Sequence, residues 1–484
     1  MNKLKFSILL LLCSFFFVDC SSDNSSENGQ IPGNSKPVTP EQWAERDLSR
    51  AIALTDTVVA HYFTGTDMTL RRYYNPYTHS VSSEVASVWM YTSAIEAVNS
   101  VMEGLKDMKE SAPNLYNTNY TRYNDLLTDL YKGLEFYSGT YTLTSYTQTK
   151  QWTVYSVDRG SSAGTADVEG NKNVYDDQEW LTRELIRSYQ ITGETEYLDK
   201  AEYLADYILD GWDCTLDANG NEIGGITWGP SYVSKHSCSN GPLVSSLVWL
   251  SEVYSGKSDA ISYRKIDQNG HRYTLSEEKD KYYLDFAEKI YNWQKNHLMM
   301  PNGVYYDLLG AQGGDAPQYE TVDGVTYRKG LPLSTPGGLA YTYNSGTMLS
   351  GGADLYSVTK DNSYLSDIQS LTNATFSVFA QKGAAREGYY SYPLDGFSTW
   401  FNDVLMRGYL AAFQFDSNDS LPLSTFQDNL DYAYANYLYK GMLPTSLLVG
   451  WSKTTANNNT EAMFEFAFAS EYAMLSHYVK QVKE

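Results

Sequence analysis

The sequence predicts an all-α protein in which six helical hairpins close into a ring, an (α/α)6 barrel with small β-hairpin insertions. Three observations lead to this fold class. Long segments carry apolar residues at helical spacing and end at Gly, Pro or Asn. Neighbouring segments repeat as pairs along the chain. Long connections precede every second segment, which gathers them at one end of a closed ring. An open solenoid built from the same hairpins is the alternative.

Twelve helices are expected from the period of the apolar residues. The first has a clear start, because Thr39 can cap it, Pro40 occupies the first turn and Gln42 completes a capping box. The expected ranges are 41–64, 83–103, 120–138, 177–192, 195–211, 241–255, 281–297, 345–359, 363–381, 399–414, 425–440 and 460–480.

Two helix pairs share the same turn, written ITGETEYL in one and VTKDNSYL in the other. The shared residues are Tyr189, Thr192, Tyr197 and Leu198, which recur as Tyr356, Thr359, Tyr364 and Leu365. The middle pair carries an insertion at about 256–280, where an Asn-Gly pair between two apolar runs predicts a β-hairpin.

Loop lengths predict which end of the ring carries the site. The long connections enter the inner, even-numbered helices, whereas the turns near Thr192 and Thr359 are short. A functional site is therefore expected at the N-terminal ends of the inner helices. The long connections are 65–82, 139–176, 212–240, 298–344 and 441–459.

The N-terminal residues predict export and a lipid anchor. Lys3 and Lys5 precede an apolar run too short to span a bilayer, which is typical of a signal peptide at 1–19. Cys20 resembles the lipidated cysteine of a bacterial lipoprotein. Residues 20–40 are rich in Ser, Asn, Gly and Pro and read as a flexible tether. We expect an outer-membrane lipoprotein of a Gram-negative bacterium, on the cell surface or the periplasmic face, with its catalytic domain at 41–484.

Composition restricts the ligand. The formal net charge of −22 argues against nucleic acid and polyanionic substrates, which need clustered Lys and Arg. Aromatic residues make up 14% of the chain and include 43 Tyr and 10 Trp, which suits stacking on sugar rings or a tyrosine-rich helical core. Six isolated His without metal-ligand spacing give no reason to expect a metal or another cofactor. Cys214 and Cys238 are either a disulfide or two buried thiols.

The motif YDDQEW places two adjacent carboxylates, Asp176 and Asp177, at the start of an expected helix. A pair of carboxyl groups is the minimal machinery for breaking a glycosidic bond, since one protonates the leaving oxygen while the other attacks or stabilises the sugar cation. The structural alternative is a capping box formed by Asp176 and Glu179.

Further segments on the same end carry polar and aromatic residues, in GGITW, SNGP, GVYYD and YTYNSG. Each residue also has a structural explanation: Asn240 and Asn344 suit N-caps, Trp228 can pack beneath a loop, and Lys235 can be solvated. The candidate substrate-binding residues are Trp228, Lys235, Asn240, Asp307, Tyr343 and Asn344.

The order and separation of these motifs resemble the endo-α-1,6-mannanases of glycoside hydrolase family 76 over about 41–480, and most sharply over 174–350. The resemblance implies an (α/α)6 barrel that cleaves α-1,6-mannosidic bonds with retention, without a cofactor. It assigns the nucleophile to Asp176 and the acid/base to Asp177, with Asp307 and Asn344 contacting sugar hydroxyls. The chain departs from the family in the 256–280 insertion, expected to affect the far side of the barrel, and in the polar Gln178-Glu179, expected to affect neighbouring subsites.

The expected partner is α-mannan or an α-mannooligosaccharide, bound by a monomer. The alternative is a non-catalytic outer-membrane carbohydrate-binding lipoprotein, which needs aromatic platforms but no convergent carboxylates. Other (α/α)6 enzymes fit less well, because sugar epimerases of this shape rely on His and uronide hydrolases need more basic residues.

Overall fold

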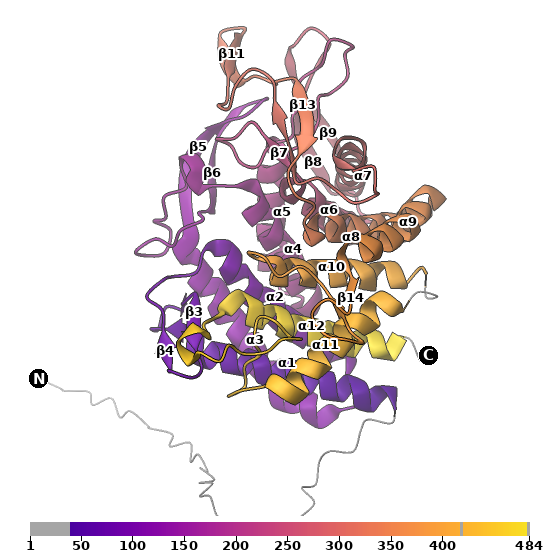
Figure 1. The fold of residues 1–484 in the computed structure, drawn as a ribbon. Helices are drawn as coiled ribbons and strands as arrows, with labels where there is room; N and C mark the ends of the chain where they lie inside the picture. The colour runs from indigo at the N-terminus through magenta and orange to yellow at the C-terminus, as the bar shows by residue number, and fades with distance from the viewer. Residues whose placement is uncertain (1–38, 417–419, 482–484) are drawn as a thin grey trace, which may run out of the picture.

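The computed structural model describes residues 39–416 and 420–481 (Figure 1). The expected signal peptide, Cys20 and all of the expected tether except Thr39 and Pro40 lie outside the described residues. Within them are twelve α-helices. They are α1 (Pro40–Tyr62), α2 (Val88–Asp107), α3 (Pro113–Leu134), α4 (Tyr175–Thr192), α5 (Thr195–Asp210), α6 (Gly241–Tyr254), α7 (Lys279–Leu298), α8 (Thr342–Thr359), α9 (Asn362–Phe379), α10 (Ser398–Phe413), α11 (Leu421–Tyr437) and α12 (Ala462–Gln481).

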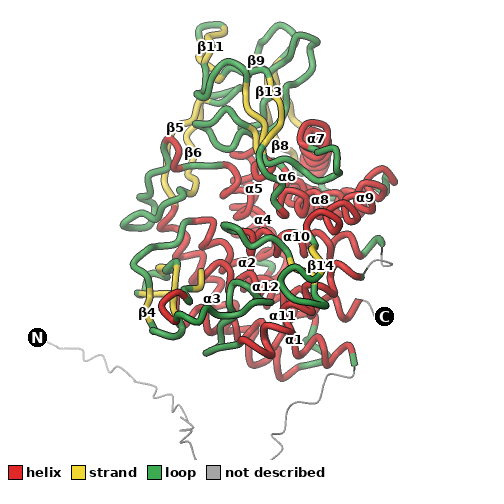
Figure 2. Tube along the Cα trace, viewed as in Figure 1, coloured by secondary structure: helices red, strands yellow, loops and turns green. Residues whose placement is uncertain are grey.

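The helices form two concentric layers (Figure 2). The inner helices contact one another in the order α2, α4, α6, α8, α10 and α12, and α12 contacts α2, so the ring is closed. Outside it, α3 packs on α2, α5 on α4, α7 on α6, α9 on α8, and α1 on α12, while α11 contacts α10 and α12. The predicted (α/α)6 barrel is confirmed, and the open solenoid is wrong because its two ends would not meet.

Burial follows position in the two layers. The outer helix α5 buries residues 198, 201, 204, 205, 207, 208 and 209, most of which recur at the spacing of a one-sided apolar face. Inner helices are buried nearly all round and approach more closely. The α8–α10 contact depends on Gly346 and Gly408, because a Cβ on Gly408 would lie 2.5 Å from the Gly346 carbonyl oxygen. The closest inner packing therefore requires residues without side chains.

The expected helix boundaries hold within a few residues, with one larger difference. The predicted capping box of α1 is present: the backbone N–H of Gln42 donates to Thr39 Oγ1 and that of Thr39 to Gln42 Oε1, both at 3.3 Å. Helix α3 begins at Pro113 rather than near residue 120, because Pro113 supplies a first-turn proline.

Small sheets occupy the connections. The three-stranded sheets are β13–β10–β7 (Leu333–Gly337, Leu308–Ala311, Lys235–His236) and β16–β3–β4 (Thr460–Glu461, Tyr73–Asn75, Ser80–Val81). The two-stranded ones are β1–β2 (Phe63–Thr64, Thr69–Leu70), β5–β6 (Ser138–Thr144, Thr149–Tyr155), β8–β9 (Ala260–Ile266, Arg272–Glu278), β11–β12 (Tyr319–Val322, Val325–Arg328) and β14–β15 (Gln381–Lys382, Tyr390–Ser391). All are antiparallel.

The predicted insertion is the hairpin β8–β9, which turns at Gly270 with φ of 84°. It reaches the long loops rather than staying at the far side of the barrel, which corrects the expectation from the sequence (Figure 1). Gln268 Nε2 donates to the Gly220 carbonyl at 3.3 Å, and Arg272 donates to the Tyr146 carbonyl at 3.1 Å and to Glu320 at 3.0 Å. The insertion thus ties three rim loops together.

None of the helices within 39–416 and 420–481 has a stretch long and apolar enough to cross a bilayer.

Candidate active site

A cavity of about 400 Å³, here called the rim cavity, lies where the inner helices begin. Helices α2, α4, α8 and α10 contribute residues from their first two turns, and the segment entering α6 contributes three more. The cavity lies at the end of the barrel where the sequence predicted a site, the N-terminal ends of the inner helices. The lining residues are Trp89, Asp176, Trp180, Trp228, His236, Cys238, Asp307, Leu339, Tyr341, Tyr343, Asp395, Gly396, Phe397, Trp400 and Phe401.

Two contacts anchor the start of α4. The Tyr175 backbone N–H donates to the Trp228 carbonyl at 2.8 Å, which joins the helix to the GGITW loop. The Gln178 side-chain amide pairs with both backbone groups of Tyr155, at 3.0 and 2.8 Å, which joins it to β6. Gln178 is fully buried and does not line the cavity. The expectation that it alters neighbouring subsites is therefore wrong, since its amide acts as a strand partner.

The acids of the motif are not caps. The N-cap residue of α4 is Val174, without a side-chain cap bond. Both carboxyl oxygens of Glu179 are buried without a hydrogen-bond partner among the described residues. The capping-box alternative for Asp176 and Glu179 is wrong, and burial raises the pKa of Glu179 well above its usual range.

Asp176 presents its carboxyl group at the cavity surface. Its Oδ2 accepts a hydrogen bond from Trp228 Nε1 at 3.1 Å, and its Oδ1 accepts one from the backbone N–H of Asp177 at 2.9 Å. Burial raises the pKa of Asp176 to about 6, while the Trp228 and Cys238 side chains and the Asp177 N–H favour the ionised form. Burial thus outweighs these three donors in setting the pKa of Asp176.

Asp177 is 6% exposed and lies in the wall of the site rather than in the cavity lining. Burial, and then the charge of Asp176, raise its pKa well above the usual range. The two neighbouring carboxyl groups therefore ionise in order, Asp176 before Asp177.

Asp307 lies in the same cavity as Asp176. The Tyr343 hydroxyl donates to Asp307 Oδ1 at 3.2 Å. This bond lowers the pKa of Asp307, but burial has the larger effect and raises it above its usual value. A Cβ on Gly338, whose φ is 86°, would lie 2.7 Å from Asp307 Cβ, so only glycine allows this loop to pack on Asp307. Trp228 also lines the cavity, with its ring stacked 5.0 Å from that of His236.

Three expected substrate-binding residues do not reach the cavity. Lys235 is buried and donates to Asp213 at 2.9 Å and to the Gly224 carbonyl. Asn240 bonds both backbone groups of Ile226, at 2.8 and 3.0 Å. Asn344 is fully buried inside α8, with its Nδ2 3.4 Å from a backbone carbonyl. The expectation of sugar contacts from these three residues is corrected, because each instead bonds the protein that shapes the wall.

The sequence reasoning missed most of the aromatic wall. Trp400 is 3% exposed and makes edge contacts with Trp89 (5.3 Å between ring centroids) and Trp180 (5.0 Å). Phe397 and Phe401 extend this wall. The signal was present in the segment DGFSTWF, because it spans the end of the connection and the first turn of α10, another inner helix.

Cys214 and Cys238 are both free and buried, so the disulfide alternative is wrong. Cys238 lines the rim cavity and Cys214 a different one.

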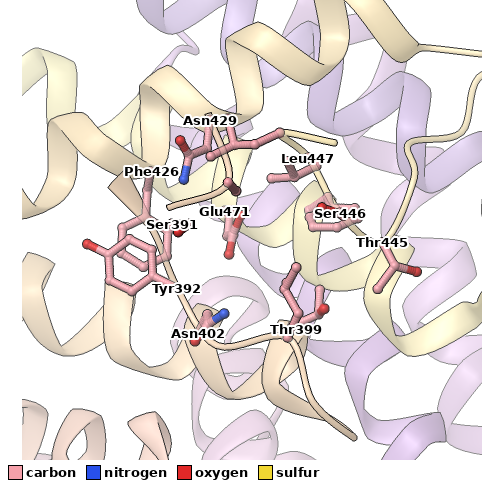
Figure 3. A pocket seen from close by; sticks show the side chains of 14 residues that line it. Ser391, Tyr392, Thr399, Asn402, Phe426, Asn429, Thr445, Ser446, Leu447 and Glu471 are labelled. Carbon is pink, nitrogen blue, oxygen red and sulfur yellow. The ribbon is translucent and has the colours of Figure 1, made fainter. Parts of the chain in front are cut away.

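A smaller cavity of about 50 Å³ is lined by Tyr392, Asn402, Asn429 and Glu471, among others (Figure 3). Helix α10 separates the two, since Trp400 and Phe401 line the rim cavity while Thr399 and Asn402 line the smaller one. The Thr399 and Ser446 hydroxyls and Asn429 Oδ1 have no hydrogen-bond partner within the described part of the chain. The space accommodates a few water molecules rather than a sugar ring.

Comparison with known proteins agrees with this fold. The sequence model of glycosyl hydrolase family 76 matches residues 271–469, a range that contains Asp307 and Tyr343 but not the Asp pair. No curated protein sequence matches the chain.

Solved structures share the fold over nearly the whole domain. A family 76 glycoside hydrolase from a bovine Bacteroides thetaiotaomicron strain is 21% identical, with 89% of this chain and 78% of that chain covered and a TM-score of 0.64. A family 76 mannosidase from Bacteroides thetaiotaomicron VPI-5482 is 19% identical, with 90% and 99% covered and a TM-score of 0.65. An inactive variant of the α-1,6-mannanase of Salegentibacter sp. HEL1_6, with two consecutive Asp replaced by Asn and α-1,6-mannotriose bound, is 19% identical, with 90% and 99% covered and a TM-score of 0.57.

The family match over 271–469 and the shared barrel confirm the resemblance inferred from the motifs: the chain is similar to glycosyl hydrolase family 76 and has the fold of its solved members.

Proposed function

We propose that the protein is a retaining glycoside hydrolase that cleaves α-1,6-mannosidic bonds within α-mannan chains. The observation that carries this proposal is the Asp176 carboxylate at the surface of an aromatic-walled cavity, directly followed by Asp177 with a higher pKa. Support for the substrate comes from the Salegentibacter α-1,6-mannanase, whose inactive variant lacks two consecutive aspartates and binds α-1,6-mannotriose.

In the first step, ionised Asp176 attacks the anomeric carbon of the bound mannose. The bond to the leaving oxygen breaks as Asp177 transfers its proton to that oxygen, which leaves a mannosyl ester on Asp176. In the second step, ionised Asp177 removes a proton from a water molecule that attacks the same carbon. The ester bond breaks, Asp176 is regenerated and the configuration is retained, since two inversions have occurred.

The environment of each carboxyl group suits its role. Three groups, the Trp228 indole, the Cys238 thiol and the Asp177 N–H, favour an ionised Asp176, as a nucleophile requires. Asp177 is more deeply buried and lies beside that charge, so it holds its proton as a donor must. The Trp89, Trp180 and Trp400 rings supply apolar faces against which a pyranose can stack.

The proposal is tested with linear α-1,6-mannooligosaccharides and purified protein. We expect shorter oligosaccharides whose first-formed anomer, followed by NMR, keeps the α configuration. Asp176→Asn and Asp177→Asn should each abolish turnover with unchanged circular dichroism and Tm. Near-normal turnover in either variant would reject the pair as catalytic.

A non-catalytic saccharide-binding protein is the second candidate, favoured by the position of Asp177 outside the cavity lining. It predicts that mannooligosaccharides bind at the aromatic wall and are recovered uncleaved after long incubation.

We also propose that the chain is lipidated at Cys20 after removal of 1–19 and is held at the outer membrane. The signal-peptide pattern and the polar stretch that follows it support this proposal.

A further inference from the structure

A second polar and aromatic cavity, here called the outer groove, lies on the outside of the barrel. It has a volume of about 700 Å³ and is formed by α3, β6 and α5, with Leu185 of α4 in its lining. None of its lining residues belongs to the rim cavity. Its volume falls in the range of about 300–1,000 Å³ typical of small-ligand sites.

Four tyrosines give the outer groove its apolar surface: Tyr131, Tyr155, Tyr197 and Tyr203. Three of their hydroxyls already have protein partners. Tyr131 pairs with Ser188 at 2.9 Å, Tyr155 donates to Glu135 at 3.1 Å, and Tyr203 accepts the Thr153 N–H at 2.8 Å. These bonds fix the rings in place. Tyr155 is buried beneath the groove, so the partly exposed rings of Tyr131, Tyr197 and Tyr203 are the ones pre-organised for contact with a ligand.

Charged groups of both signs lie along the same groove. Lys200 Nζ is 5.1 Å from the centre of the Tyr155 ring, and Glu196 and Asp199 also line the groove. None of these three side chains forms an ion pair with another described residue. Donors and acceptors next to ring faces suit a neutral polyhydroxylated ligand, whereas a polyanion is disfavoured by the three carboxylates Glu135, Glu196 and Asp199 against two lysines.

Among the described residues, the repeated hairpin has no equivalent of the outer groove, because the tyrosine at the corresponding position is covered there. Tyr364 occupies the position of Tyr197 in the repeated hairpin, yet it is 5% exposed. There α7 covers it, with the Tyr291 ring 5.3 Å away and Glu288 accepting its hydroxyl at 3.2 Å. At Tyr197 the neighbouring element is α3, whose Tyr131 ring lies 4.7 Å away and leaves the groove open.

We propose that the outer groove is a second, non-catalytic binding site for neutral oligosaccharide segments of the polymer that the rim cavity cleaves. This inference takes its ligand class from the proposed function. A second point of attachment raises the effective concentration of a polymer at the rim cavity without changing the chemistry on short substrates.

The test compares Tyr197→Ala and Lys200→Ala with Tyr356→Ala, a matched control. Tyr356 is a half-buried tyrosine on α8 that packs on Phe415 and lies outside the groove. Binding of linear α-1,6-mannan is measured by affinity electrophoresis in an Asp176→Asn background, with dextran as the comparison polymer. Turnover of mannan and of α-1,6-mannotriose is measured in the active background.

We expect both groove variants to weaken mannan binding and to lower turnover of mannan about 3- to 10-fold, with mannotriose turnover and the control unchanged. Unchanged mannan binding in Lys200→Ala, which removes a partly exposed side chain from a folded helix, would overturn the inference. If the groove variants weaken mannan binding but the wild-type protein never cleaves mannan, the proposed function is overturned and the second binding site is retained.

Discussion

Replacing Trp228 by Phe removes the indole N–H that donates to Asp176 Oδ2 at 3.1 Å and keeps an aromatic ring at the cavity wall. This bond favours the ionised carboxylate, so its loss raises the pKa of Asp176 from about 6. A hydrogen bond to a charged group contributes about 1.5–3 kcal/mol, and 1.36 kcal/mol corresponds to one pKa unit, so we expect a rise of about one to two units.

The consequence is a shift in the pH dependence of catalysis. The nucleophile must be ionised, so kcat/KM rises as the pH passes the pKa of Asp176. In Trp228→Phe the acidic limb should move from near pH 6 to about pH 7–8, and at pH 7 the ionised fraction should fall from about nine-tenths to between about a half and a tenth. The assay is kcat/KM for a linear α-1,6-mannooligosaccharide from pH 4 to 9.

The matched control is Tyr343→Phe, which removes the donor to Asp307 instead. Its acidic limb should stay near pH 6. An unmoved acidic limb in Trp228→Phe, or equal shifts in both variants, would refute the assignment of this limb to Asp176.

Three further predictions concern the support of the site, stability and anchoring. Trp400 donates to Glu96 Oε2 at 3.1 Å, and Glu96 also pairs with buried Arg407. Glu96→Gln should therefore lower the free energy of unfolding in urea by about 3–5 kcal/mol and shift the tryptophan fluorescence. Wild-type values for both would contradict this. Burial raises the pKa of Glu465 from 4.5 to about 8 in the folded protein. Between pH 4.5 and 8 the side chain is protonated when folded and ionised when unfolded, so the free energy of unfolding falls by up to about 1.4 kcal/mol per pH unit as the pH rises. Glu465→Gln should flatten this decline in unfolding free energy, and an equally steep decline would exclude Glu465 as its source. Cys20→Ala should move the protein from the membrane fraction to the soluble fraction of its cells. Continued sedimentation of the variant with membranes would refute lipidation at Cys20.

Local signals in the sequence were enough for the helices and for the end of the barrel at which the rim cavity lies. The apolar period located all twelve helices, the Thr39 and Gln42 pair marked the start of α1, and the Asn-Gly turn marked the β8–β9 hairpin. Those signals involve residues within a few positions of one another, where backbone geometry and side-chain spacing decide the outcome. Loop lengths then indicated the end of the ring at which Asp176 lies.

The roles of individual polar residues depended on contacts between distant segments. Lys235 finds Asp213 and Gln178 finds Tyr155, so side chains that could have faced a ligand bond the protein instead. The Trp400 ring lines the cavity partly because Glu96, from the opposite part of the chain, holds its N–H.

Ionisation at the site was decided by burial, which no local pattern measures. The sequence placed two aspartates side by side, and the closed barrel removed Asp177 from water while leaving Asp176 at a surface with three donors around it. Chain-local spacing therefore determined the helices and the adjacency of the acids, whereas closure of the ring was decided by the contact of α12 with α2. The tertiary structure alone decided which carboxyl keeps its proton, because desolvation depends on everything packed around a group rather than on its neighbours along the chain.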